Sequence, residues 1–215
     1  MKLKKIASLA LAGIMAVSML AGCNGSNGGN GGASSSEPTN PSTGLSAAIL
    51  EETDLAKKYA VAEDYAKLNN AVNAVVKNAA PSYVTGVKNL NTLDNETALV
   101  NLSKSIMTGA TYCDTSNTIV DALNNAATKK EDIVAYRLFY TSRTSSDDVI
   151  ANMIANQLDT IATQLSLPQT ADGDSYEYTV SVAKSDWLAG NEADVTKDGV
   201  VVGIAIHFDY TKAEF

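Results

Sequence analysis

Two stretches of strict alternation near the C-terminus limit the folds open to this chain. In the first, Tyr176, Tyr178, Val180 and Val182 alternate with Glu177, Thr179 and Ser181. In the second, Val200, Val202, Ile204, Ile206, Phe208 and Tyr210 alternate with Val201, Gly203, Ala205, His207, Asp209 and Thr211. Successive side chains of a strand point to opposite faces of a sheet, so the pattern predicts two strands, which we expect to pair antiparallel.

The region before these strands predicts a third strand and a helix. Residues 133–140 are rich in β-branched and aromatic side chains, which favours a strand, although an apolar run of this kind also fits a buried helix. Over 147–166 an apolar stripe recurs every three or four residues, from Ile150 to Leu165. Ser145 or Ser146 caps this helix, and Pro168 closes it. We expect the helix to pack on the sheet.

The first part of the domain is predicted to be helical. Residues 45–80 contain no Gly or Pro, and Thr53 offers a cap for a break. A second helix is expected over Glu96–Met107, with Asn95 as its cap and Gly109 just past its end. A third is expected over Asn117–Thr128, capped by Thr115 or Ser116. The fold class is therefore α+β, with N-terminal helices followed by a small, mainly antiparallel sheet that carries one packed helix.

The N-terminus has the parts of a signal peptide in their usual order. Three lysines lie within the first five residues, and Ile6–Leu20 follows without a charge. This run is shorter than the roughly 20 apolar residues that span a bilayer. It ends in Leu20-Ala21-Gly22-Cys23. The sequence is thus divided into a signal peptide (1–22), a linker that begins at Cys23 (23–44) and a single domain (45–215).

The four residues that end at Cys23 resemble a bacterial lipobox, in which small residues precede a cysteine that becomes lipidated. The resemblance implies cleavage before Cys23 and a diacylglyceryl group on its thiol. It places the protein on the outer side of the cytoplasmic membrane, or of the outer membrane if the source has one. Two acyl chains hold a protein on a bilayer stably. The resemblance covers the leader alone, and the sequence of the domain resembles no family that we identify.

Charge and linker composition limit the partners of the domain. The leader holds three lysines and no acid, so the net charge of −8 becomes −11 once the leader is removed. A chain with this net charge repels nucleic acid and anionic lipid headgroups. We therefore expect no nucleic-acid partner, and membrane contact only through the lipid on Cys23. Residues 24–44 are rich in Gly, Asn, Ser and Pro, which predicts a flexible tether that keeps the domain near the membrane.

The cysteines and acidic loops indicate neither a disulfide framework nor a metal centre. Once Cys23 is lipidated, Cys113 has no partner in the chain, and we expect it to be a small buried hydrophobe. A single histidine and no Cys/His spacing motif argue against a metal site, and we expect no cofactor. The acidic loops around Asp172–Glu177 and Asn191–Asp198 do not have the spacing of an EF-hand, and solvated turns explain them.

Three side chains invite a functional interpretation, but none is assigned a catalytic role. Ser181 and Lys184 match the Ser-x-x-Lys pattern of penicillin-binding enzymes, but that chemistry needs the serine at a helix start and Ser181 lies on a predicted strand. His207 shares a strand face with Asp209, and a serine would have to be brought in to complete a hydrolytic site. Trp187 is either an edge-packing residue or a surface contact for sugars or peptides.

The sequence therefore predicts an anchored lipoprotein with a binding or interaction module, whose ligand is an unidentified protein or carbohydrate. An envelope hydrolase that uses His207 or an acidic pair is the alternative. A pocket that joins His207 to a serine and a carboxylate within hydrogen-bond reach would favour the hydrolase, and a convex sheet face without a site would count against it. A solute receptor and a pilin-like subunit are lower alternatives, the latter by analogy of fold alone.

Overall fold

A computed structural model describes residues 42–51, 53–54, 60–78, 90–142, 146–166, 174–187 and 199–213. The helices are α2 (Ser42–Glu51), α3 (Ala66–Asn78), α4 (Thr97–Ile106), α5 (Ser116–Lys129) and α6 (Asp147–Gln164). The strands are β1 (Ala60–Ala62), β2 (Asn91–Thr92), β3 (Ala110–Tyr112), β4 (Ile133–Ser142), β5 (Ser175–Trp187) and β6 (Gly199–Thr211). No helix in these ranges is long and apolar enough to cross a membrane.

The strands form one mixed sheet with the order β1-β5-β6-β4-β2, and β3 also pairs with β4. The three long strands β5, β6 and β4 are antiparallel neighbours, as the alternation predicts. The short strands β1 and β3 run parallel to β5 and β4 respectively. The predicted α+β class and the strand at 133–140 are confirmed.

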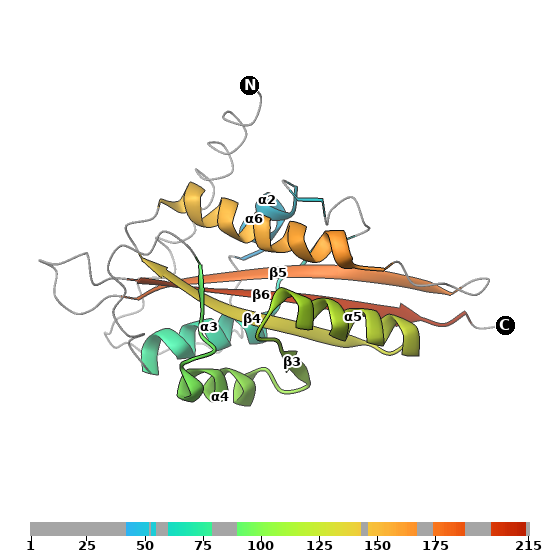
Figure 1. Cartoon of the computed structure of the whole chain (residues 1–215), viewed down its shortest axis with the longest axis horizontal. Coiled ribbons are helices and arrows are strands. Elements are labelled where there is room, and N and C mark those ends of the chain that lie inside the picture. The colour runs from blue at the N-terminus through green and yellow to red at the C-terminus, as the bar shows by residue number, and fades with distance from the viewer. Residues whose placement is uncertain are drawn as a thin grey trace, which may run out of the picture.

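Helices cover the two faces of the sheet unequally. Phe208 and the apolar residues in phase with it form a core with α2, α5 and α6, and we name this the covered face. Val201 and Ala205 lie on the opposite side and form a second, smaller core with α3 and α4. In Figure 1, α2 and α6 lie on one side of the strands, and α3 and α4 lie on the other.

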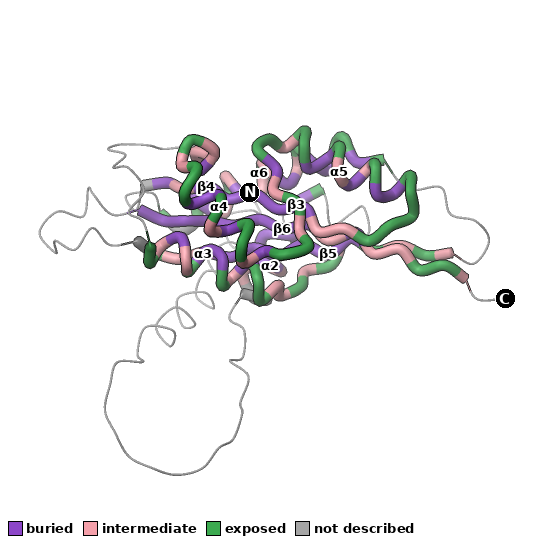
Figure 2. The backbone as a smooth tube through the Cα atoms, turned by 90° about the horizontal axis from the view of Figure 1, so that it is seen from below, coloured by how far each residue is buried: buried purple, intermediate pink, exposed green. Residues whose placement is uncertain are grey.

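The second side is covered along only part of the strands, and we name it the half-open face. On β6, Val201, Gly203 and Ala205 are buried, whereas His207 and Asp209 are partly exposed. A Cβ on Gly203 would lie 2.8 Å from both Leu68 and Val72, which shows how closely α3 approaches the sheet there. In Figure 2 the middle part of the strands is buried. The start of β5 and the end of β6, which lie side by side near the C-terminus of the chain, are partly exposed or exposed.

The capping residues predicted from the sequence are found at two helix starts, and two other predicted caps are not found. Thr115 caps α5 in a capping box with Thr118, and Ser146 caps α6, as predicted. The expected cap at Asn95 is wrong, because α4 begins after Glu96 and no side chain caps it. Gly109 does not end α4 directly: Met107 does, and Gly109 occupies a turn with φ +86°.

The prediction that residues 45–80 are helical, with Thr53 as a cap for a break, is wrong at residues 60–62. The chain forms α2, which begins at Ser42, then β1, and then α3. Residues 60–62 are Ala-Val-Ala beside lysines and acids, a composition that favours a helix locally. They form a strand because they pair with Tyr178–Val180 on the edge of β5, so a tertiary contact overrides the local preference.

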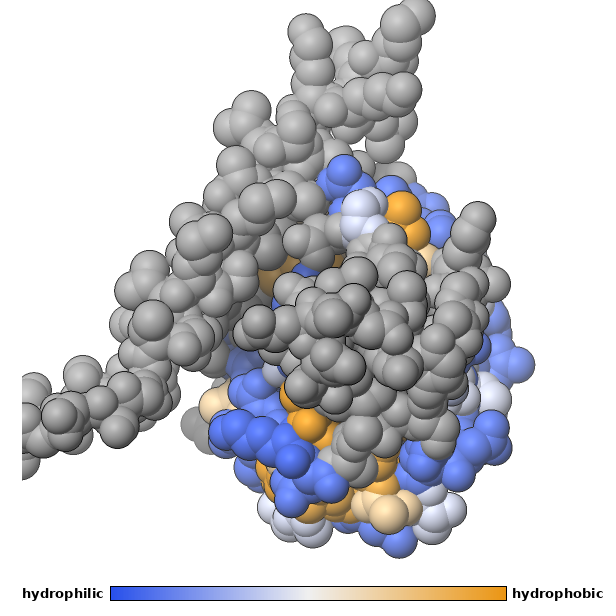
Figure 3. All heavy atoms as spheres, turned by 90° about the vertical axis from the view of Figure 1, so that its left-hand side faces the viewer, coloured by the Kyte–Doolittle hydropathy of each residue, from blue (hydrophilic) through white to orange (hydrophobic). Residues whose placement is uncertain are grey.

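The described residues at the end of the molecule where β4 and β5 finish are mostly hydrophilic. Figure 3 views this end and shows hydrophilic residues around hydrophobic areas. Val61 and Val149 are the large apolar side chains that remain exposed among the described residues, and they lie on different elements. The described surface therefore offers no large apolar patch for docking.

Candidate functional site

The uncovered part of the half-open face contains a small hollow, which is the candidate site. It is lined by Glu63, Tyr65, Val134, Thr179, Ser181, Ala205 and His207. Its volume is about 10 Å³, roughly what is needed to hold one water molecule. The hollow therefore accepts a single small polar group rather than a sugar ring.

Strand register places the floor of the hollow. Thr179 on β5 is directly opposite His207 on β6, and Ser181 is opposite Ala205. Directly opposed residues on neighbouring strands point to the same side of the sheet. The side wall comes from Glu63 and Tyr65, which connect β1 to α3. The sequence predicted the shared face of the strand residues but not this wall, because it assigned residues 60–65 to a helix.

His207 and Asp209 form a pair along the same strand. His207 Nε2 lies 3.0 Å from Asp209 Oδ1, and both side chains are partly exposed. Burial raises the pKa of the Asp209 carboxyl, and the negative charges of Asp132 and Glu63 raise it further, while His207 lowers it. Asp132 and Glu63 therefore disfavour the charged form of Asp209.

The floor of the hollow carries two hydroxyl side chains from β5. The Ser181 hydroxyl donates to the backbone carbonyl of Glu63 and so fixes the wall to the floor. Thr179 lines the hollow beside it and is 6 % exposed.

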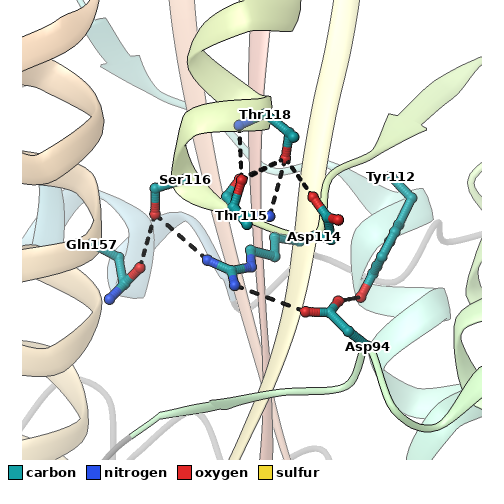
Figure 4. A network of polar contacts seen from close by, with 8 residues as sticks. Asp94, Tyr112, Asp114, Thr115, Ser116, Thr118 and Gln157 are labelled. Atoms are coloured by element: carbon teal, nitrogen blue, oxygen red, sulfur yellow. Dashed lines mark hydrogen bonds and ion pairs between the residues drawn. The ribbon is translucent and has the colours of Figure 1, made fainter.

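A second polar cluster lies on the covered face around Arg137 (Figure 4). Arg137 is 8 % exposed, and its Nη2 lies 3.9 Å from Asp94 Oδ2 while Nη1 donates to Ser116 Oγ at 3.5 Å. Ser116 donates in turn to Gln157, and Tyr112 donates to Asp94 at 2.6 Å. The guanidinium also lies over the Phe139 ring. The cluster joins α5, α6 and β4.

The Arg137 cluster is structural rather than a candidate binding site. Desolvation lowers the pKa of Arg137, and its Nε has no hydrogen-bond partner. Burial together with the Asp94 hydrogen bond raises the pKa of Tyr112 well above its usual range. The hollow described above lies on the opposite face of the sheet. The cluster is thus a buried charge with loose partners.

Two other groups highlighted by the sequence have structural roles. Cys113 is a buried free cysteine, as predicted, and burial raises the pKa of its thiol to about 11. Asp174 accepts hydrogen bonds from Tyr210, Lys130 and the Ala213 amide, so these contacts hold the pKa of its carboxyl below the usual range. Asp174 thereby fastens the end of the sheet, whereas Asp172 and Gly173 lie outside the described residues.

Other sequence predictions fall where the structure gives no description. Cys23, the leader, most of the linker, the Trp187 side chain and the loop 191–198 lie outside the described residues. Within the described ranges, no group of three His, Cys, Asp or Glu side chains is placed to hold a metal ion. Glu63, Tyr65 and Thr179 are the site residues that sequence reasoning missed.

Comparison with known proteins gives no relative from which a function could be transferred. No protein-family model matches the sequence, and no curated protein and no solved structure is significantly similar to it.

Proposed function

We propose that this chain is an extracytoplasmic lipoprotein, held on the outer side of a membrane through Cys23, and that its domain binds a partner without converting it chemically. The leader and the Leu20–Cys23 box support the anchor. The observation that carries the binding role is the hollow on the half-open face. There, Thr179 and Ser181 form a polar floor beside Glu63 and His207, at a part of this face where the described residues of β6 are partly exposed.

The state of Ser181 favours binding over catalysis. A serine nucleophile needs its proton directed at a base. The Ser181 proton is directed at the Glu63 carbonyl, while the Nε2 of His207 is engaged with Asp209. Attack by Ser181 would therefore require the bond that holds the wall of the hollow to break first.

Intact-mass analysis of the membrane fraction tests the anchor. In wild type we expect a chain that starts at Cys23 and carries the mass of a diacylglyceryl group. In Cys23→Ala we expect unprocessed or released protein without that mass. A Cys23→Ser variant is the conservative control, because it keeps the size of the side chain but lacks the thiol. Unlipidated wild-type protein with the same mass in soluble and membrane fractions would contradict the anchor.

A hydrolase is the second candidate, because Ser181, His207 and Asp209 follow one another along the half-open face. A fluorophosphonate probe, which reacts with activated serines, separates the two functions. A binding module is expected to form no adduct at neutral pH. An adduct that is lost in both Ser181→Ala and His207→Ala, while both variants remain folded, would establish the hydrolase instead.

A further inference from the structure

We infer that α2 and β1 form a removable latch over the outer edge of β5, and that this edge pairs with an extended polypeptide segment when the latch opens. We name α2 and β1 together the latch. The inference goes beyond the proposed binding at the hollow, because it assigns a second, conditional site and the chemistry of its partner.

The first support is a side chain that takes the place of a strand residue. Ser46 on α2 is fully buried. Its hydroxyl accepts from the Val182 amide at 2.9 Å and donates to the Val182 carbonyl at 3.4 Å. A neighbouring strand would supply the same acceptor and donor through its backbone. Ser46 therefore occupies a pairing position on β5 without being part of a strand.

The second support is that this position continues the ladder of β1. β1 pairs in parallel with Tyr178–Val180, and the Glu63 amide donates to the Val180 carbonyl. Val182 lies two residues further along β5, and its backbone groups point to the same side. The latch thus covers consecutive pairing positions of one edge. Without it, the backbone groups at these positions would be a template for another strand.

The order of the elements makes the latch separable from the sheet. α2 and β1 precede the other described elements, and β5 pairs with β6 along its whole length whether or not the latch is in place. In the described part of the latch, the large apolar side chains that are buried are Ile49 and Leu50. Opening the latch therefore exposes much less apolar surface than unfolding the sheet, and we expect it to need less free energy.

The polar contacts beside the latch are also few in kind and lie near the surface. The Asp54 amide donates to Asp159 Oδ1 of α6 at an exposed position. The Ser181 hydroxyl donates to the Glu63 carbonyl at a partly buried one. Water replaces partners of this kind with a small net change in free energy. These contacts close the latch without making it part of the core.

The strand β1 shows which segment fits the edge. Ala60 and Ala62 pack against the core of the covered face, whereas the Val61 side chain between them is 47 % exposed. A partner strand therefore needs small side chains at alternate positions and accepts a larger one between them. Backbone hydrogen bonds supply affinity in this mode of recognition, and the alternate side chains supply selectivity. We expect the partner segment to run parallel to β5, as β1 does.

Hydrogen exchange of single amides tests the opening. The full-length protein, purified as expressed in mild detergent and labelled with ¹⁵N, is followed by NMR. The amides of Leu50, Glu63 and Val182 lie on three different segments, and a latch that opens as a unit gives them one common protection factor. We expect that factor to be at least about tenfold lower than the factor of Ile206 in the middle of the sheet. Fraying of α2 alone would leave Glu63 and Val182 protected.

A matched pair of serine variants identifies the contact that closes the latch. Ser46→Ala is expected to accelerate exchange at Leu50 and Glu63, which Ser46 does not contact by hydrogen bonds, by about tenfold, and to leave Ile206 nearly unchanged. Ser103→Ala removes the same atom from a fully buried serine of α4, which is bonded to Val100 and Tyr136. This control should not accelerate the latch amides relative to Ile206.

A peptide tests the edge itself. The probe is a fluorescent heptapeptide with blocked ends, built around Ala-Val-Ala, the sequence of β1. Its control carries N-methyl groups on alternate amides and cannot pair with a strand. We expect saturable binding that is about tenfold tighter for Ser46→Ala than for wild type, because the open form is more populated in the variant. The N-methylated peptide is expected not to bind.

The results either support or overturn the latch. Exchange of Glu63 and Val182 in step with Ile206 in the wild type would show that the edge opens only with the whole fold. Equal binding of the two peptides, or no binding to a folded Ser46→Ala variant, would show that the edge does not accept a strand. The wild-type exchange pattern decides the first question even if Ser46→Ala does not fold. None of these results affects the mass test of Cys23.

Discussion

Helices cover the two faces of the sheet to different extents, and adjacent residues of β6 show the contrast. Phe208 points to the covered face and is fully buried, whereas His207 points to the half-open face and is partly exposed. Three helices cover the first face, and α3 with α4 covers only part of the second. The covered face holds the larger of the two cores, and part of the other face is left open to solvent.

The contrast also shows where polar groups are tolerated. On the covered face Arg137, Thr141 and Tyr178 each have a buried polar atom without a partner, which reduces stability there. On the half-open face the Ser181 hydroxyl, which is also nearly buried, donates to the Glu63 carbonyl.

The largest expected effect compares neighbours on β6. Phe208→Ala removes a buried ring that contacts Tyr176 and Tyr178, and we expect a loss of about 3–5 kcal/mol in the free energy of unfolding. His207→Ala is the matched variant on the opposite face and is expected to change it by less than about 0.5 kcal/mol. Urea denaturation measures both. Equal losses would contradict the division between the two faces.

The next effect concerns the buried charge on the covered face. Asp94→Ala leaves the Arg137 guanidinium without its carboxylate, and we expect a loss of about 2 kcal/mol. Arg137→Met replaces the charge by an apolar chain of similar length and is expected to be neutral or stabilising. Thermal or urea unfolding measures the free energy of unfolding of both variants. A larger loss for Arg137→Met than for Asp94→Ala would show that the guanidinium is better satisfied than its contacts indicate.

A smaller effect is expected where α3 meets the half-open face. Gly203→Ala places a Cβ 2.8 Å from Leu68 and Val72, and the resulting overpacking should cost about 1–2 kcal/mol in the free energy of unfolding. Adding Val72→Ala to this variant makes room for the methyl group. A double-mutant cycle should therefore show positive coupling, whereas strict additivity would mean that α3 does not lie close to Gly203.

The smallest effect is a pH dependence on the uncovered side. The Asp209 pKa is raised in the folded state, so the folded chain holds this proton at a pH where the unfolded chain has lost it. The Asp209 contribution to stability therefore falls as the pH rises through the range above its ordinary value of 3.8. Asp209→Asn should lack this fall and be slightly more stable than wild type near pH 7. Parallel stability curves for the two proteins would contradict the raised pKa.

Sequence patterns predicted what depends on local periodicity. The alternation around Val180 and Ile206 and the cap at Ser146 are read from neighbouring residues, and each is found in the structure. The same alternation placed Ser181 and His207 on the polar side of their strands. Burial of Cys113 was also predicted, because an unpaired cysteine usually behaves as a small hydrophobe.

Local sequence patterns did not predict the wall of the hollow. Residues 60–65 contain good helix-forming residues, and only the free edge of β5 makes a strand of Ala60–Ala62. Glu63 and Tyr65 reach the hollow because that strand ends beside it.

Ser46 on α2 has a consequence for how copies of this chain meet. Its buried hydroxyl accepts from the Val182 amide and donates to the Val182 carbonyl, where β1 no longer pairs with β5. A side chain thus takes up the backbone groups that a strand from another molecule would use. Together with β1 it closes this stretch of the sheet margin to edge-to-edge aggregation. Copies of this chain at high concentration would therefore remain separate at this margin, and Ser46→Ala would leave the Val182 amide and carbonyl open to a strand of another molecule.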